Sequence, residues 1–395
     1  MTTDLSARAL WSLGATQIIG YGTLYYAFAL LAPGMAADLG WSEAQVFAAL
    51  TVALLVGGFC APVAGRLADR HGAATVMAAG SVGAALALTV CALSPGPVLY
   101  AIGLVGMEIA GACVLYATAF VAIVQIAGDR AQRRITHLTL IAGFASTIFW
   151  PLTTWLAGMF DWRQIFGLFA AMHLGLCLPL HLSLRGAGHP APRTAAPRVP
   201  AGRGDGQTGD LVLLLGAFAI FGYVLGSVTV HMLPLLTALG LGPSGALVAA
   251  LFGPAQVASR VVNMAFGRNL GQIELAVIAA ILPVAGIAAL ASGGTVAAAI
   301  CFALLFGMGS GLTSIVSGTV PLELFGREGY GRAVGSLSAA RQLAAALAPF
   351  LLSVQISRFG AAAALWSAVA AGLAGTVLLI WLALRRRPRA VLRQG

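Results

Sequence analysis

The chain has 395 residues, of which 59% are hydrophobic and only 9% are charged. Soluble domains have roughly 25% charged residues, so this chain cannot cover itself with a water-exposed surface and is predicted to be an integral membrane protein. Its formal net charge of +10 would suggest a nucleic-acid partner in a soluble protein. We expect no such partner here, because the positions of the arginines explain the charge differently.

Apolar segments long enough to cross a bilayer follow one another along the chain. A spanning helix needs about 20 mainly apolar residues. The first segment is expected to be a span rather than a signal peptide, because it is long and contains Gln17 and three tyrosines. The sequence predicts an all-α membrane protein with twelve transmembrane helices in two pseudo-symmetric halves of six, at residues 9–33, 44–66, 73–94, 97–124, 135–158, 163–182, 211–238, 244–266, 273–293, 295–319, 332–355 and 360–384.

One break between these segments differs from the others. Residues 183–210 are rich in Pro, Gly and Arg, a composition that cannot bury a core. We therefore expect a cytoplasmic linker at 183–210, between an N-terminal half at 1–182 and a C-terminal half at 211–395.

The basic residues indicate the orientation in the membrane. All 22 of them are arginines. If the N-terminus is cytoplasmic, all except Arg163, Arg358, Arg260 and Arg341 lie in cytoplasmic segments, which is a strong positive-inside pattern. Both termini are thus predicted to be cytoplasmic. The basic run at 385–389 would act as a topology anchor or contact anionic lipid.

A charged loop interrupts the apolar sequence at "GRLADRHG", Gly65 to Gly72. Glycines allow close packing and a tight reversal, and the Asp69 carboxylate can accept hydrogen bonds from an arginine or from a helix N-terminus. The loop resembles the signature loop of the major facilitator superfamily. The resemblance implies a transporter with a midplane site between two halves and a loop that latches the cytoplasmic side in one conformation. The latch is assigned to Gly65, Asp69, Arg70 and Gly72, with Arg133 and Arg134 of the loop at 128–134 as candidate partners.

Three ionisable residues lie deep within predicted spans: Glu108, Arg260 and Arg341. Such residues usually face a bundle interior or a wet cavity and mark substrate or proton pathways. Two positive charges face one negative charge, so an anionic ligand would compensate the excess. The planar guanidinium fork suits a carboxylate. The alternative is a structural ion pair between Glu108 and one of the arginines.

Polar residues at helical spacing surround these charges. They form stripes in spans 1 and 8 and a cluster in span 11 around Arg341 with Ser338 and Gln342, and the resemblance implies that these helices line the central cavity. The predicted substrate-binding residues are Arg260, Arg341, Gln256, Asn263, Gln17, Tyr21 and Tyr25.

Glu108 is the candidate proton-coupling residue, because burial favours the protonated form of a carboxyl group. The sequence contains no cluster of carboxylates that could bind sodium, so we expect protons as the coupling ion. The sequence contains no nucleotide-binding motif, metal triad or nucleophile motif, so we expect no enzyme activity, no cofactor and no bound metal.

Residues 37–72 resemble bacterial members of the monocarboxylate and oxalate/formate carrier group. In that group an arginine of span 8 binds the substrate carboxylate, and Arg260 matches it, while Gln256 stands where the group has an acid. The resemblance implies a carrier of a small organic anion in a bacterial inner membrane. We expect symport with protons rather than with sodium, because no clustered carboxylate site is visible. We expect a monomer whose partners are a small-molecule substrate, protons and lipid.

Two other functions are considered. Efflux of a drug, metalloid or small metabolite is the main alternative. The segment at 143–158 contains Pro151 but lacks the G-P-x-x-G-G element of proton/drug antiporters, and span 4 lacks their arginine. A membrane sensor on a transporter scaffold is less expected, because it would not need polar stripes.

Overall fold

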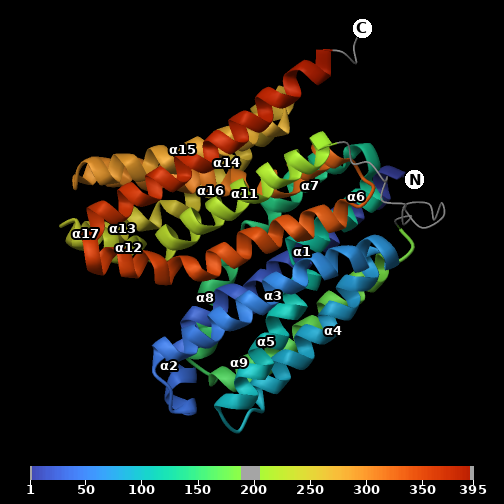
Figure 1. Ribbon diagram of the computed structural model, residues 1–395. Coiled ribbons are helices and arrows are strands. Elements are labelled where there is room, and N and C mark those ends of the chain that lie inside the picture. The colour runs from blue at the N-terminus through green and yellow to red at the C-terminus, as the bar shows by residue number, and fades with distance from the viewer. Residues whose placement is uncertain (1, 188–204, 392–395) are drawn as a thin grey trace. The chain divides into compact units, whose positions relative to one another are not determined.

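The computed structural model describes residues 2–187 and 205–391, and every regular element among them is helical (Figure 1). The expected linker at 183–210 lies largely outside the described residues. Within the described residues, ten stretches are long and apolar enough to cross a membrane. Two of them, Pro97–Ala157 and Tyr330–Arg386, have 61 and 57 residues, more than the ~20 that one crossing needs. The count of twelve spans stays a prediction.

The chain divides into two compact units. Unit 1 comprises Met1–Pro192 and Leu324–Ala339, and unit 2 comprises Arg193–Glu323 and Ala340–Gly395. The boundaries expected at residues 182 and 211 stay predictions as well.

Unit 1 contains the first ten α-helices and the start of α17. In Figure 1, α4, α5 and α9 of this unit run side by side. The elements are α1 (Thr2–Tyr21), η1 (Gly22–Tyr26), α2 (Ala27–Leu39), α3 (Glu43–His71), α4 (Ala73–Ala92), α5 (Pro97–Val114), α6 (Tyr116–Ala127), η2 (Gly128–Arg130), α7 (Ala131–Ala142), α8 (Ala145–Ala157), α9 (Trp162–Met172), η3 (His173–Cys177) and α10 (Leu178–Ser183).

Unit 2 contains the later helices and most of α17, which bends at Gly360, where φ is 84°. The elements are α11 (Asp205–Val230), α12 (Met232–Ala238), α13 (Gly242–Ala250), α14 (Phe252–Phe266), η4 (Gly267–Asn269), α15 (Gln272–Ser292), α16 (Val296–Phe325) and α17 (Tyr330–Val391).

Three irregularities in the helices of unit 1 position its polar and aromatic side chains. η1 and η3 are π-helical turns, which are rare and occur frequently at functional sites. Between α5 and α6, Leu115 has an extended conformation and breaks the helical run. The two π-turns contact each other: the Thr23 hydroxyl donates to the Ile19 carbonyl and accepts from His173 Nε2, at 2.9 Å.

Glycines of α16 set the packing of unit 2. A Cβ atom at Gly307 would lie 2.6 Å from the Phe252 carbonyl oxygen of α14, and one at Gly309 would overlap the ring of Pro283 of α15. Small residues allow such close helix contacts in membranes. As a result, α14 and its polar side chains are held directly against the backbone of α16.

Candidate functional site

Arg260 of α14 is buried in unit 2, with 5% of its surface exposed. Its Nε–H donates to the Gly311 carbonyl at 3.3 Å and to Ser314 Oγ at 3.2 Å, both on α16. Gly311 permits this approach, because a Cβ atom there would overlap Ser259 Oγ and the Gln256 carbonyl oxygen. Within the described residues no hydrogen bond reaches the two terminal nitrogens of Arg260.

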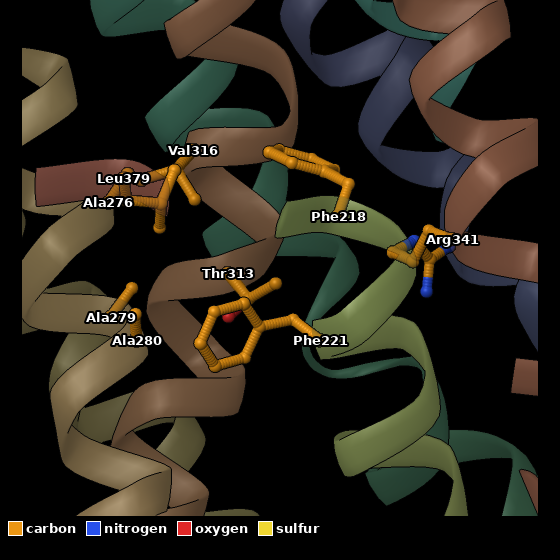
Figure 2. A pocket seen from close by; sticks show the side chains of 9 residues that line it. All are labelled: Phe218, Phe221, Ala276, Ala279, Ala280, Thr313, Val316, Arg341 and Leu379. Carbon is orange, nitrogen blue, oxygen red and sulfur yellow. The ribbon is translucent and has the colours of Figure 1, made fainter. Parts of the chain in front are cut away.

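Arg341 of α17 lines a small cavity of unit 2. The cavity measures about 20 Å³, room for about one water molecule. Figure 2 shows the Arg341 side chain beside α11, which carries two phenylalanines, while three alanines of α15 lie on the opposite side. The other lining residues are Phe218, Phe221, Ala276, Ala279, Ala280, Thr313, Val316 and Leu379.

The acidic side chains described in unit 2 are engaged elsewhere. Asp210 Oδ2 pairs with Arg386 Nη2 at 2.6 Å. Glu274 accepts from the Gly271 N–H at 3.3 Å, and Glu323 accepts from the Gln272 N–H at 2.8 Å. Neither Arg260 nor Arg341 therefore has a carboxylate partner among the described side chains of this unit.

Gln256 and Asn263 lie on the same helix as Arg260, as their spacing predicts. Both side chains are half-buried. Asn263 Oδ1 is buried and has no hydrogen-bond partner within the described part of the chain. Three polar side chains thus follow one helix of unit 2, and their role in binding stays a prediction.

Tyrosines of unit 1 form an aromatic cluster around the first π-turn. The ring centroids of Tyr21 and Tyr116 are 4.7 Å apart, and those of Tyr25 and Tyr26 are 5.2 Å apart. Tyr26 also meets Trp150 of α8 at 6.2 Å, edge to face. The sequence pattern identified Tyr21 and Tyr25 but missed the other three rings. Only the tyrosine pair "YY" at 25–26 could have drawn attention to Tyr26.

Gln17 stabilises the break that brings Tyr116 to this cluster. It is fully buried, and its Nε2 donates to the Val114 carbonyl at 2.7 Å. That carbonyl ends α5, where the extended Leu115 interrupts the helical hydrogen bonds. Gln17 Oε1 is buried without a hydrogen-bond partner among the described residues. The structure thus gives Gln17 a structural contact, and its binding role stays a prediction.

Glu108 of α5 is half-buried and lies against α3. A Cβ atom at Gly57 would stand 3.0 Å from both Glu108 Cβ and its carbonyl oxygen. No hydrogen bond or ion pair holds the Glu108 carboxylate within the described part of the chain. Both expectations for this residue, proton coupling and a structural ion pair, therefore stay open.

The signature loop of unit 1 binds the start of α17. Asp69 Oδ1 accepts from the Gly331 N–H and Oδ2 from the Arg332 N–H, each at 2.9 Å. The first N–H groups of a helix have no partner within the helix and form the positive end of its dipole. A carboxylate is therefore well placed there. Both helices need a glycine at this contact. A Cβ atom at Gly65 of α3 would overlap the Gly331 carbonyl, and one at Gly331 of α17 would overlap the backbone of Gly65.

Further contacts lie in and near this loop. Gln125 of α6 donates to the Ala68 carbonyl at 3.0 Å and accepts from the Ala73 N–H at 2.9 Å, so it joins the ends of α3 and α4. Asp129 forms an ion pair with Arg327. Gly72 has φ of 85°, which explains the glycine at this reversal. Arg70 and Arg133 are exposed and Arg134 is half-buried, and the latch role of all three stays a prediction.

Comparisons with solved structures show the fold. The human organic anion transporter MFSD10 (TETRAN) is 16% identical with a TM-score of 0.74, and the match covers 95% of this chain and 99% of that one. The proton:xylose symporter XylE is 14% identical with a TM-score of 0.68, and the match covers 96% of this chain and 95% of that one. The transporter FucP is 12% identical with a TM-score of 0.70, and the match covers 94% of this chain and 97% of that one.

One curated relative and one family also match. An uncharacterized 38 kDa protein in the 23S RNA operon of Thermoproteus tenax is 29% identical over 192 residues. The match covers 48% of this chain, and the chain spans about half the length of that relative. The Major Facilitator Superfamily matches residues 13–349, most of the chain. Members of this family are transporters and generally not enzymes. The chain therefore belongs to the Major Facilitator Superfamily and is a multi-pass membrane transporter.

Proposed function

We propose that the protein is a secondary active transporter that moves a small organic anion, a carboxylate, by alternating access. The observation that carries this proposal is the pair Arg260 and Arg341, whose guanidinium groups have no carboxylate partner among the described side chains of unit 2. Placing an arginine at the centre of a spanning helix costs roughly 2.5–3.5 kcal/mol on insertion scales. A bound anion would compensate that cost.

The local geometry of Arg260 supports a carboxylate. Its Nε is anchored to α16, which fixes the plane of the guanidinium and leaves the terminal nitrogens for a ligand. Guanidinium and carboxylate groups form paired, parallel hydrogen bonds. The resemblance of residues 37–72 to monocarboxylate and oxalate/formate carriers supports the same substrate class. So does the description of one similar structure as an organic anion transporter.

Glu108 would couple transport to protons. A carboxyl group at membrane depth without a basic partner can exchange a proton when water reaches it. Gly57 allows α3 to pack directly against the helix that carries it, so a movement of α3 would change its exposure. The proposal includes symport with protons in a bacterial inner membrane, by a monomer with cytoplasmic termini.

Asp69 would stabilise one state of the transport cycle. Its two hydrogen bonds join α3 to the start of α17. Their partners, Gly331 and Arg332, are 262 and 263 residues away in the sequence. Hydrogen bonds to a charged group contribute roughly 1.5–3 kcal/mol, enough to bias an equilibrium between two conformations.

Counterflow in proteoliposomes tests the anion site. Vesicles loaded with an unlabelled carboxylate are diluted into a labelled one, and exchange is followed for the wild type, Arg260→Gln and Arg341→Gln. We expect each variant to slow exchange at least tenfold. Arg358→Gln is the matched control, because Arg358 lies between the predicted spans at 332–355 and 360–384 and not within one. Unchanged exchange in both site variants would refute the proposal.

A further inference from the structure

The last turns of α17, nearest the C label in Figure 1, carry two consecutive arginines with different surroundings. Arg386 is paired with Asp210 of α11: its Nη2 lies 2.6 Å from Asp210 Oδ2, and its Nε donates to the same oxygen at 2.8 Å. Asp210 is buried, with 1% of its surface exposed. This ion pair therefore fastens the end of α17 to the start of α11 within unit 2.

Arg385 points in another direction, because consecutive side chains on an α-helix lie about 100° apart. It is exposed, and no carboxylate forms an ion pair with it among the described residues. Two neighbours position its guanidinium group. A Cβ atom at Gly209 of α11 would lie 3.1 Å from Arg385 Nη1, and the guanidinium carbon lies 5.8 Å from the centre of the Trp381 ring. The second distance is within the range of a cation–π contact.

The face of α17 that leads to Arg385 is exposed and apolar. Between residues 362 and 384 every exposed side chain is apolar, and these side chains recur at helical spacing. The larger ones are Trp366, Leu373, Val377, Ile380, Trp381 and Leu384. Residues four apart lie on the same face of a helix, so Arg385 follows Trp381 on this face. In a membrane transporter, an exposed face without polar groups is expected to contact lipid tails.

The end of this face has the chemistry of the boundary between lipid tails and headgroups. Tryptophan is enriched at that boundary, where its ring lies at headgroup level. Phospholipid phosphates lie at the same level, and the planar guanidinium group of arginine suits a phosphate. A zwitterionic headgroup brings its own positive charge to the phosphate, whereas an anionic headgroup does not. Arg385 without a carboxylate partner therefore favours an anionic headgroup.

We propose that Arg385 and Trp381 form a binding site for the phosphate of an anionic phospholipid. Arg385 binds the phosphate oxygens, Trp381 holds the guanidinium at headgroup level, and the acyl chains lie along the apolar face that includes Val377. A free phosphate ester has the same charged group, but it would make no use of this apolar face. The site lies within unit 2 and does not depend on which substrate is transported.

Native mass spectrometry of the full chain in a non-ionic detergent tests the site. The probes are dioleoyl phosphatidylglycerol, dioleoyl phosphatidylcholine and glycerol 3-phosphate. The two lipids have the same tails, so a difference between them reports the headgroup, while glycerol 3-phosphate offers a phosphate without tails. We expect the first phosphatidylglycerol to bind about fivefold more tightly than the first phosphatidylcholine. Excess glycerol 3-phosphate should not displace it.

Matched variants locate this preference on the chain. Arg385→Gln should give the two lipids equal affinity, whereas Arg385→Lys keeps the charge and should retain most of the preference. Trp381→Leu should weaken phosphatidylglycerol about twofold through loss of the cation–π contact. Trp366→Leu is its control, because Trp366 is an exposed tryptophan on the same face, far from Arg385. Arg358→Gln is the control for charge and should keep the wild-type preference.

Several results would overturn the lipid site. Equal binding of both lipids to the wild type, or an unchanged preference in Arg385→Gln, would show that Arg385 does not select the headgroup. An equal loss of preference in Arg358→Gln and Arg385→Gln would show attraction to net charge rather than a site. Displacement of phosphatidylglycerol by glycerol 3-phosphate would show that the site takes a free phosphate ester instead of a lipid. Retained preference in Arg385→Lys excludes misfolding as the cause of a loss in Arg385→Gln.

Discussion

Gln17 and Asp69 each compensate for missing backbone hydrogen bonds. Gln17 binds the Val114 carbonyl where α5 stops, and Asp69 binds the first N–H groups of α17. Both side chains act on backbone groups that a helix end leaves unpaired. Each contact gives a polar side chain a backbone partner, and each can be tested separately.

Replacing Gln17 with methionine should destabilise unit 1. The Val114 carbonyl would lose its partner in a buried setting, which costs about 1–3 kcal/mol. We expect a lower midpoint of thermal unfolding in detergent. Gln132→Met, at an exposed position of α7, should leave the midpoint unchanged. An unchanged midpoint for Gln17→Met would show that the hydrogen bond adds nothing to stability.

Replacing Asp69 with asparagine should expose the start of α17 to exchange. The variant loses the charge and one acceptor oxygen, so the Gly331 and Arg332 amides are less protected. Hydrogen–deuterium exchange of a peptide covering 330–335 should accelerate about tenfold, since such bonds contribute roughly 1.5–3 kcal/mol. Asp161→Asn, at the N-terminus of α9, serves as the control and should leave this peptide unaffected. Equal exchange in wild type and Asp69→Asn would contradict the latch contact.

At the scale of helices, glycine positions determine which elements can touch. Gly65 of α3 and Gly331 of α17 meet backbone to backbone, and Gly335 packs equally closely on Ala61. Such contacts tolerate no side chain, because the nearest atoms belong to the backbone and cannot rotate away. The latch thus depends on helix packing as well as on the Asp69 carboxylate.

Gly331→Ala should therefore disrupt the latch while leaving its hydrogen-bonding groups in place. We expect faster exchange at 330–335 and a lower unfolding midpoint. Gly167→Ala of α9 is the matched control, because a Cβ atom there meets nothing within 4 Å. Helix propensity favours alanine over glycine by about 1 kcal/mol, so the control should be neutral or stabilising. A neutral Gly331→Ala would show that α3 and α17 do not need this close contact.

Hydropathy predicted the helical class and the membrane location. The apolar segments are long enough to cross a bilayer, and the chain has too few charged residues to form a water-exposed surface. The irregular elements could not be predicted. The turns at 22–26 and 173–177 and the break at Leu115 lie inside continuous apolar segments and carry no marker in the sequence. A helix N-terminus was one expected kind of partner for Asp69, but the particular helix could not be identified, because Gly331 and Arg332 lie far along the chain.

For the whole molecule, the charges carry the functional argument. Most of the 22 arginines lie outside the predicted spans, and the predicted orientation places them on the cytoplasmic side. Arg260 and Arg341 are exceptions within unit 2, and Glu108 is an exception within unit 1. We interpret the first two as the anion site and the third as the proton-coupling group.

Glu108→Gln should separate exchange from energy coupling. Glutamine keeps the size of the side chain but cannot release a proton. We expect anion counterflow to stay within about threefold of the wild-type rate while accumulation driven by a pH gradient is lost. Uptake assays with and without an imposed gradient check this. Accumulation that persists in Glu108→Gln would assign proton coupling to another group.

The most direct test of organic anion transport uses purified protein in liposomes that contain a pH-sensitive dye. A panel of aliphatic and aromatic carboxylates is added outside, and protein-free liposomes measure the leak. We predict acidification above the leak with some of the acids, lost in Arg260→Gln and Arg341→Gln and retained in Arg358→Gln. No proton movement with any acid, or movement that survives both site variants, would contradict the account.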